Sequence, residues 1–239
     1  MNARIPKRGF AIALSGAILA LPSFALADAG NGGTAPPAPG ATAPFDPSFE
    51  LSTKHTVFLG KALRIAGSVH DAAGKTVQVQ ARSGEGPWLA VATAPADASG
   101  AFATSWRPSG PGQFELRGVI AGATTATDAG SASAPRTVTV YKPARATWYG
   151  PGFYGKQTAC GMRLTRSLVG VAHKKLPCGT QVSVSYRGRS IVAPVVDRGP
   201  FAHNAQWDLT AAAAKQLHMT VTSRIGAAPI DQPVQPPAL

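Results

Sequence analysis

The sequence predicts an all-β protein with two domains, a β-sandwich followed by a small β-barrel, and three observations support this fold class. Short apolar runs separated by turn residues recur in residues 48–142, and a second set follows in residues 144–228. Only one segment of the second set has a helical pattern. The 239 residues suffice for two modest domains. The composition, with 44% hydrophobic and 14% charged residues, fits globular domains and excludes a disordered polyelectrolyte.

The first 27 residues have the pattern of a secretory signal peptide. Three basic residues within the first eight precede an apolar run at 10–21, which is too short to span a bilayer. The small residues at 25–27 match a cleavage site, so we expect the mature chain to start at Asp28. We therefore expect an exported protein, periplasmic or secreted and associated with the cell wall, without a stable membrane anchor. A retained anchor helix is the alternative.

Residues 28–47 are expected to form a flexible leader because Pro, Gly and Ala are frequent there. In the first domain, apolar and β-branched runs between turns such as 71–74 and 97–100 indicate strands. These strands are 55–59, 63–69, 75–81, 88–93, 101–106, 113–120 and 136–141. Seven strands at this spacing favour a β-sandwich, and the segment resembles bacterial immunoglobulin-like or fibronectin-like modules. We expect Trp88 and Trp106 in its core, since large aromatic side chains usually serve burial; sugar stacking is the alternative.

The barrel domain, 144–228, is expected to begin after a short linker at 141–143. Its first strand should run into a loop rich in Gly and Pro. One helix is expected at 210–217, where Thr210 can cap the N-terminus and a run of alanines has high helix propensity. The expected strands are 144–149, 168–172, 181–186, 190–196 and 223–227. Residues 229–239 are expected to form a disordered tail.

Positive charge is concentrated in the C-terminal half of the chain. Residues 144–239 contain eleven basic and three acidic residues, a net charge of +8, whereas residues 28–143 contain nine and eight, a net charge of +1. An exported basic module indicates an anionic partner, such as a cell-wall polymer, an acidic glycan or lipid head groups. Nucleic acid would also suit the charge, but the export pattern argues against it. Charge that serves solubility alone is the alternative.

The two cysteines, Cys160 and Cys178, lie in the same half of the chain. In an oxidising compartment an even pair is expected to form a disulfide. His173 lies between them, but the CxxC and HxxxH spacings typical of zinc sites are absent from the sequence. We therefore expect no metal and no cofactor.

Asp197 and Asp208 are the candidate acid/base groups of the barrel domain. The third acid of the C-terminal half, Asp231, lies in the expected tail. Asp197 ends an apolar strand and begins a Gly-Pro turn, where partial burial favours a raised pKa and Arg198 opposes it. Asp208 precedes the expected helix, whose dipole favours the ionised carboxylate. Two acids in contrasting environments can take separate roles. The structural alternative for Asp197 is that it only accepts backbone N–H bonds in its turn. The alternative for Asp208 is that it only supports the helix N-terminus.

Other polar and aromatic candidates flank the expected strands. His173 ends a strand beside two lysines, where it can bind an anionic group or transfer a proton; a surface histidine is the alternative. Thr147, Trp148 and Tyr149 offer a hydroxyl and aromatic faces for stacking on sugar rings. The alternative is a strand whose side chains simply alternate between core and surface.

Five segments, in order, resemble the RlpA family of septal-ring lytic transglycosylases (rare lipoprotein A). They are 146–150 (ATWYG), 158–161 (TACG), 171–182 (VAHKKLPCGTQV), 197–201 (DRGPF) and 207–210 (WDLT). The resemblance implies a six-stranded double-psi β-barrel, shared with expansins and barwin-like proteins, and glycan strands of peptidoglycan as the ligand. It also implies cleavage of the MurNAc–GlcNAc linkage without water, leaving a 1,6-anhydro end. One acid/base group suffices for that chemistry, because the sugar's own hydroxyl is the nucleophile, whereas hydrolysis usually needs two carboxylates.

On this resemblance Asp208 is the leading general acid/base. Asp197 and His173 would position it or stabilise the developing charge. The groove-lining, substrate-binding residues would be Thr147, Tyr149, Arg198 and Trp207.

The chain departs from the family at two positions that are acidic in well-studied members, where it has Met162 and Thr165; of this set only His173 is kept. Methionine cannot transfer a proton, and threonine is a poor general acid.

Similarity to expansins matches Asp208, Asp197 and Thr147 to polar groove residues of proteins that bind and loosen polysaccharide without cleavage. The cysteine pair also resembles the disulfide-containing members of the superfamily. The sequence therefore leaves three functions open. They are a peptidoglycan lytic transglycosylase, a non-catalytic expansin-like wall-binding protein with the sandwich as spacer or second binding surface, and a secreted interaction protein or inhibitor.

Overall fold

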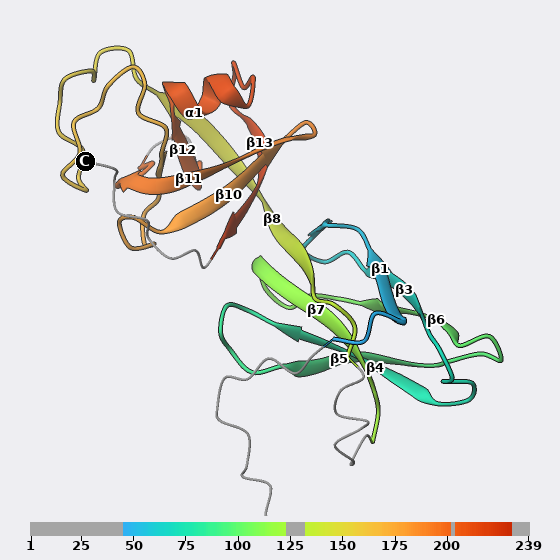
Figure 1. Ribbon diagram of the computed structural model, residues 1–239. Helices are drawn as coiled ribbons and strands as arrows, with labels where there is room; N and C mark the ends of the chain where they lie inside the picture. The colour runs from blue at the N-terminus through green and yellow to red at the C-terminus, as the bar shows by residue number, and fades with distance from the viewer. Residues whose placement is uncertain (1–44, 123–131, 202–203, 231–239) are drawn as a thin grey trace, which may run out of the picture. The chain divides into compact units, whose positions relative to one another are not determined.

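The computed structural model describes residues 45–122, 132–201 and 204–230 (Figure 1). The predicted signal peptide, most of the predicted leader and nearly all of the predicted tail lie outside these residues and stay predictions. Among the helices that the structure describes, none has the length and apolar character needed to cross a membrane.

The first domain contains two β-sheets. One sheet has the order β1-β3-β6, and the other has the order β5-β4-β7-β8, with β2 pairing in parallel with β8. The strands are β1 (Phe49–Thr53), β2 (Thr56–Phe58), β3 (Leu63–Val69), β4 (Thr76–Arg82), β5 (Leu89–Pro95), β6 (Ala101–Trp106), β7 (Gly112–Ile120) and β8 (Arg136–Tyr149). All seven strands expected from the sequence are present, within one or two residues at most ends. Strand β1, which directly follows the Pro-rich leader, was not expected from the sequence.

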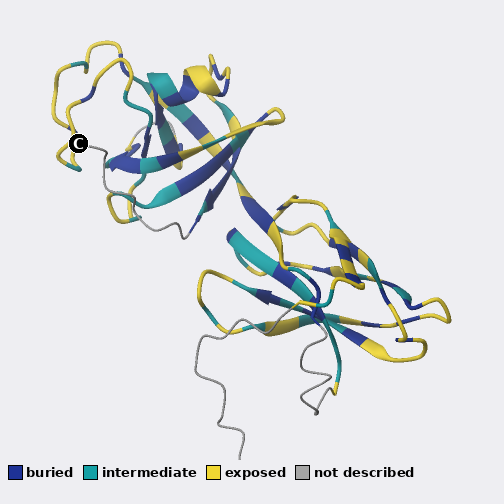
Figure 2. Ribbon diagram, viewed as in Figure 1, coloured by how far each residue is buried: buried dark blue, intermediate teal, exposed yellow. Residues whose placement is uncertain are grey.

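One hydrophobic core joins the two sheets, because inward-facing residues of both belong to the same cluster. Leu51 and Ile65 come from one sheet, and Val79, Leu116 and Val138 from the other. The alternation along each strand that predicted these elements is visible as alternating buried and exposed residues in Figure 2. An immunoglobulin-like or fibronectin-like relationship for this domain stays a prediction.

The two tryptophans of this domain have different environments. Trp106 is buried and makes a T-shaped contact with Phe114, as predicted. The prediction was wrong for Trp88, which is only half-buried and precedes β5. The guanidinium groups of Arg82 and Arg117 lie 4.5 and 4.3 Å from the centre of its ring. Cation–π contacts with these two strand residues hold the indole outside the core.

Strand β8 belongs to both domains. Its first part pairs with β7 and its second part with β12 and β13. The prediction of a linker at 141–143 was therefore wrong, because these residues lie within one continuous strand of 14 residues. Pro143 fits this strand because proline also adopts extended backbone, and it pairs there with Gly226 of β13.

The second domain is a closed six-stranded β-barrel, which confirms the fold expected for it. The strands follow one another around the ring in the order β8-β12-β9-β11-β10-β13, and β13 pairs again with β8. They are β9 (Val171–Ala172), β10 (Gln181–Tyr186), β11 (Arg189–Asp197), β12 (Trp207–Thr210) and β13 (Ser223–Pro229), with the short helix α1 (Ala211–Gln216) after β12.

Strand β9 is shorter than expected from the apolar run at 168–172. The N–H of Leu168 donates to the Thr165 hydroxyl, and the N–H of Gly170 donates to the Thr210 hydroxyl. These side-chain acceptors replace strand partners, so the ladder begins only at Val171.

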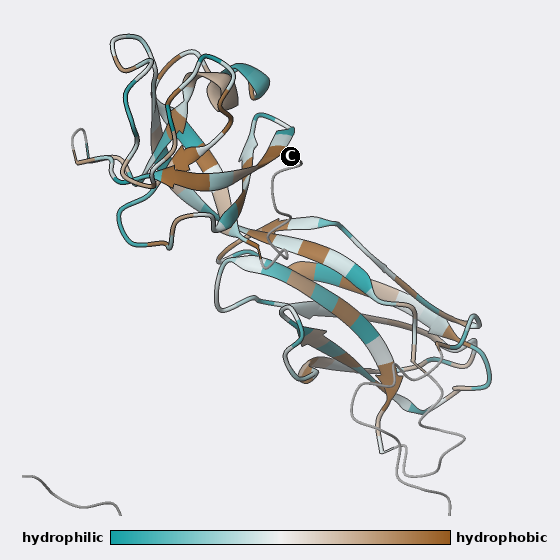
Figure 3. Ribbon diagram, turned by 60° about the vertical axis from the view of Figure 1, so that its left-hand side comes forward, coloured by the Kyte–Doolittle hydropathy of each residue, from teal (hydrophilic) through white to brown (hydrophobic). Residues whose placement is uncertain are grey.

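Val182, Val184, Val195 and Leu209 fill the barrel, and Leu217 packs against them from the segment after α1. Figure 3 shows hydrophobic residues concentrated along the barrel strands. The β10–β11 hairpin turns at residues 187–188, both at positive φ, which is typical of a two-residue hairpin loop. The Thr210 side chain accepts the N–H of Ala213 and caps α1, which confirms the expected cap.

Cys160 and Cys178 form the predicted disulfide, with their Cα atoms 5.7 Å apart. The bond joins the loop after residue 155 to the loop between β9 and β10. Both loops adjoin the end of β11, where Asp197 lies, so the bond restrains the surroundings of that carboxylate.

Candidate functional site

Strand register places four residues of the barrel in one row. Thr147 of β8 pairs with Asp208 of β12, Asp208 pairs with Ala172 of β9, and Ala172 pairs with Asp197 of β11. Neighbouring strands lie about 4.8 Å apart, so the two aspartates are separated by two such spacings, roughly 10 Å between Cα atoms. The row therefore brings together both carboxylates that the sequence singled out.

Asp208 is half-buried, and its Oδ1 accepts a hydrogen bond of 2.7 Å from the Thr147 hydroxyl. It lies in a strand, two residues before Thr210, which caps the helix. Support of the helix N-terminus is therefore the work of Thr210. The Asp208 carboxylate instead borders a groove on the barrel surface.

Asp197 is held by backbone amides. Its Oδ1 accepts the N–H of Ala159 at 2.9 Å and that of Arg198 at 2.8 Å. Asp197 thus accepts main-chain N–H groups at its turn, as the structural alternative for this residue expected. The residue also lines the same groove as Asp208, so these bonds fix a groove carboxylate in position.

Tyr149 places a phenol in the same groove. Its hydroxyl is buried beside the Asp197 carboxylate, which attracts the phenolic proton, although the two groups fall short of a regular hydrogen bond. Burial, together with the negative charges of Asp197 and Asp208, raises the pKa of Tyr149. The phenol is therefore protonated at neutral pH and available as a hydrogen-bond donor.

The groove has a volume of about 460 Å³ and combines this polar floor with exposed aromatic rings. Phe201 is 82% exposed, Phe153 is 51% exposed and Trp148 is 38% exposed. The Lys156 ammonium lies 5.3 Å from the centre of the Phe153 ring. A concave site with apolar faces and a few convergent polar groups is typical of a ligand-binding site.

Sequence reasoning missed Phe153, Phe201 and Lys156 as groove residues. A signal was present, because both phenylalanines stand in segments rich in Gly and Pro, where neighbouring residues cannot form a core around them.

His173 and Trp207 do not line this groove. Their rings stack on each other, with centroids 4.4 Å apart, beside a different hollow. His173 Nδ1 accepts the N–H groups of Lys175 and Leu176, which places the proton of the neutral ring on Nε2. Burial, followed by the positive charges of Arg198, Lys142 and Lys174, lowers the pKa of His173.

Arg198 borders the groove, but its guanidinium is directed at a neighbouring loop. Its Nη1 donates to the carbonyl oxygens of His173 and Leu176, at 3.3 and 2.9 Å, and its Nη2 contacts Cys178 Sγ at 3.1 Å. These contacts hold the β9–β10 loop in place. They also occupy the Arg198 guanidinium, which is then less available to bind a ligand.

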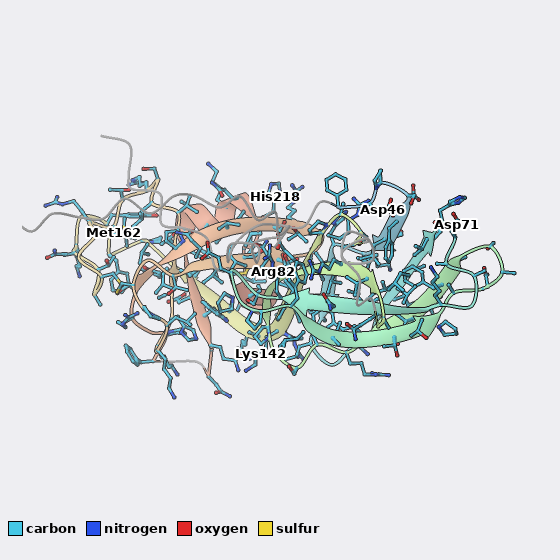
Figure 4. All side chains as sticks on the ribbon, turned by 60° about the horizontal axis from the view of Figure 1, so that its bottom comes forward. Asp46, Asp71, Arg82, Lys142, Met162 and His218 are labelled. Carbon is cyan, nitrogen blue, oxygen red and sulfur yellow. A yellow bond between two sulfur atoms is a disulfide. The ribbon has the colours of Figure 1, made fainter. Side chains whose placement is uncertain are left out.

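The two positions at which the family pattern has acids lie outside the groove lining. Met162 is an exposed loop residue (Figure 4). The Thr165 hydroxyl bonds locally to Ser167 and to the N–H of Leu168. In the part of the chain that the structure describes, no group of three or more His, Cys, Asp or Glu residues could hold a metal ion.

Comparison with known proteins finds relatives of the barrel domain. A family model described as lytic transglycolase matches residues 142–231, which include the whole row and all the residues that line the groove. A probable endolytic peptidoglycan transglycosylase RlpA of Synechocystis is 42% identical over 86 residues, and an endolytic peptidoglycan transglycosylase RlpA of Campylobacter jejuni is 40% identical over 87 residues. The barrel belongs to the RlpA family. A probable RlpA transglycosylase of Aquifex aeolicus is 43% identical over 76 residues.

The similarity to these RlpA relatives is confined to the barrel. It covers 35%, 36% and 31% of this chain, and only 27%, 30% and 34% of the Synechocystis, Campylobacter and Aquifex proteins. A solved structure, the Streptomyces papain inhibitor, is 31% identical, with a TM-score of 0.30, over 37% of this chain and 92% of its own. The first domain lies outside the matched family region.

Proposed function

We propose that the RlpA-family barrel binds glycan strands of peptidoglycan in the groove beside Asp208 and cleaves them as a lytic transglycosylase. The observation that carries this proposal is the row from Thr147 through Asp208 to Asp197, which lines a groove with aromatic walls. The names of the relatives, which are endolytic peptidoglycan transglycosylases, supply the substrate class.

In the proposed reaction Asp208 acts as general acid and then as general base. The protonated carboxyl transfers its proton to the glycosidic oxygen as the bond from C1 of MurNAc to that oxygen breaks. The C6 hydroxyl of the same MurNAc attacks C1 and forms the 1,6-anhydro ring. The hydroxyl proton returns to the Asp208 carboxylate, so no water is consumed and the acid is regenerated.

Other groove residues would serve this step by position and charge. The Thr147 hydroxyl orients the Asp208 carboxyl through Oδ1. The Asp197 carboxylate, roughly two strand spacings away, stabilises the positive charge that develops at C1. The phenol of Tyr149, which is buried beside the Asp197 carboxylate without a regular hydrogen bond to it, donates a hydrogen bond to a sugar oxygen. His173 faces another hollow and receives no role at the reacting atoms.

A second candidate function is supported by the departures from the family pattern. Because Met162 and Thr165 replace acids and lie away from the groove lining, the barrel can be a non-catalytic wall-binding module that keeps only the binding surface. The groove with its aromatic rings, and the positive net charge of the C-terminal half of the chain, suit either function.

Incubation of purified residues 28–239 with peptidoglycan sacculi separates the two functions. Release of anhydro-muropeptides is expected for the enzyme. Co-sedimentation with sacculi, without released fragments at high protein loading, would instead establish the binding module. A protein that neither binds nor cleaves sacculi would contradict both.

We also propose that the protein is exported, since residues 1–27 have the signal pattern and the substrate lies outside the cytoplasm. N-terminal sequencing of the protein purified from its host is expected to begin at Asp28. Recovery of a chain that still carries residues 1–27, in the cytoplasmic fraction, would contradict export.

A further inference from the structure

A hollow of about 510 Å³, here called the arginine hollow, adjoins the groove along strand β8. Arg145 lines the hollow and Thr147 lines the groove, and the two residues are two positions apart in β8. Side chains at this spacing project from the same face of a strand, with their Cα atoms roughly 7 Å apart. Gln206 in the hollow and Asp208 in the groove have the same spacing. A polymer that occupies the groove can therefore extend from Asp208 over the arginine hollow.

Two arginines lie side by side in this hollow. Arg145 of β8 and Arg224 of β13 are direct partners in the antiparallel pair, and both are exposed. Like charges directly opposite each other destabilise a sheet. Neither guanidinium makes an ion pair or a hydrogen bond with any residue that the structure describes. The repulsion between the two guanidiniums is therefore not offset by an acidic partner among the described residues.

The other polar side chains of the hollow are neutral. Asn204 and Gln206 contribute amide groups, and Thr222 contributes a hydroxyl. Among the lining residues that the structure describes, none is Asp or Glu. Two guanidiniums with amide and hydroxyl donors beside them are complementary to a small oxyanion, which they can bind through charge-assisted hydrogen bonds.

We propose that the arginine hollow binds the carboxylate of a MurNAc lactyl group in the glycan strand that occupies the groove. The lactyl group carries the only carboxyl function of the sugar chain itself, so it is the oxyanion that a strand beside Asp208 brings to the hollow. The inference rests on the proposed function, which places the strand in the groove. Arg145 and Arg224 are then binding residues that hold the strand in register and take no part in bond cleavage.

The test uses two forms of the glycan strand. Strands released from sacculi with an amidase have free lactyl carboxylates, and coupling of the same strands to methylamine converts these carboxylates to neutral amides. The variant is Arg145→Gln combined with Arg224→Gln in residues 28–239. The control is Arg163→Gln combined with Arg166→Gln, which removes the same charge from exposed positions of the barrel domain that line neither the hollow nor the groove.

For strands with free carboxylates we expect the Arg145/Arg224 variant to bind about fivefold more weakly than wild type, a modest loss because both guanidiniums are exposed to solvent. Amidated strands should bind wild type and variant equally, and the control should match wild type on both forms. An equal loss by the variant on both forms, no loss on either, or the same loss by the control would overturn the carboxylate site while leaving glycan binding intact. Failure of the wild type to bind either form would overturn the proposed function, and this inference with it.

Thermal unfolding separates a binding effect from a folding effect. The melting temperature of the Arg145/Arg224 variant should equal or exceed that of wild type, because the two substitutions remove a like-charge pair. A clearly lower melting temperature would show that the arginines stabilise the fold, which would contradict their assignment to a ligand.

Discussion

The Thr147 hydroxyl donates a hydrogen bond of 2.7 Å to Asp208 Oδ1, joining two residues that lie 61 positions apart in the chain. The bond crosses the parallel β8–β12 pair, in which the two residues are direct partners. A strand-to-strand contact of this kind fixes the orientation of the carboxyl more firmly than a loop would. Thr147 is therefore a positioning residue in the proposed mechanism.

Thr147→Val should slow cleavage with little change in binding. Valine has a similar volume but lacks the hydroxyl, so the Asp208 carboxyl loses its orientation. We expect kcat to fall by about tenfold, equivalent to roughly 1.4 kcal/mol of transition-state stabilisation, while KM changes little. Initial rates of anhydro-muropeptide release measure both constants. Thr147→Ser should restore most of the rate, and a serine variant as slow as the valine variant would contradict the positioning role.

Tyr149→Phe should separate stability from ligand binding. The Tyr149 hydroxyl is buried without a regular hydrogen bond among the described residues, so its removal should change the free energy of unfolding by no more than about 1 kcal/mol. Binding to sacculi should weaken, because the ligand loses a hydrogen-bond donor. Thermal unfolding and co-sedimentation report the two effects. A variant that is clearly less stable yet binds normally would show that the phenol is structural.

The pKa of His173 predicts a loss of stability in mild acid. Burial and the nearby charges of Arg198, Lys142 and Lys174 lower this pKa in the folded state. The stability that the neutral ring contributes is present above the ordinary value of 6.5, and it decreases as the pH falls below that value toward the lowered pKa. Between pH 7.5 and pH 5.0, the melting temperature of wild type should therefore fall further than that of His173→Gln. His55→Gln, at an exposed position, serves as the control. Equal decreases in wild type and His173→Gln would contradict this role.

Phe201→Ala should weaken glycan binding without unfolding the barrel. The ring is 82% exposed, so its removal creates no cavity and costs little stability. Loss of an aromatic face from the groove should reduce the fraction that sediments with sacculi. Val221→Ala removes an exposed apolar side chain outside the groove lining and should bind as wild type does. Equal binding by both variants and wild type would show that Phe201 does not contact the ligand.

Local sequence patterns predicted most of the strands, because alternation within each strand reflects which side chains face a core. They could not predict that β8 continues through Pro143, since a Lys-Pro pair is equally compatible with a linker. Trp88 was placed in the core on residue type alone. Its actual position depends on two arginines, one on β4 and one on β7.

The sequence indicated some of the residues that line the groove but not the geometry of the site. Scarcity of acids directed attention to Asp197 and Asp208, and both line the groove. Their common neighbour Ala172 follows from non-local strand register, which no short motif specifies. His173 lies beside the same strands, yet its side chain turns to Trp207. The sequence motif that contains His173 does not indicate the direction of its side chain.

Asp208→Asn tests the central claim most directly, because the amide is nearly isosteric with the carboxyl and can still accept the Thr147 hydrogen bond. The account predicts that this variant sediments with sacculi as wild type does but releases anhydro-muropeptides at least 100-fold more slowly, about the effect of losing a general acid. Asp71→Asn, at an exposed position of the first domain, should cleave at the wild-type rate. Undiminished release of anhydro-muropeptides by Asp208→Asn would contradict the account.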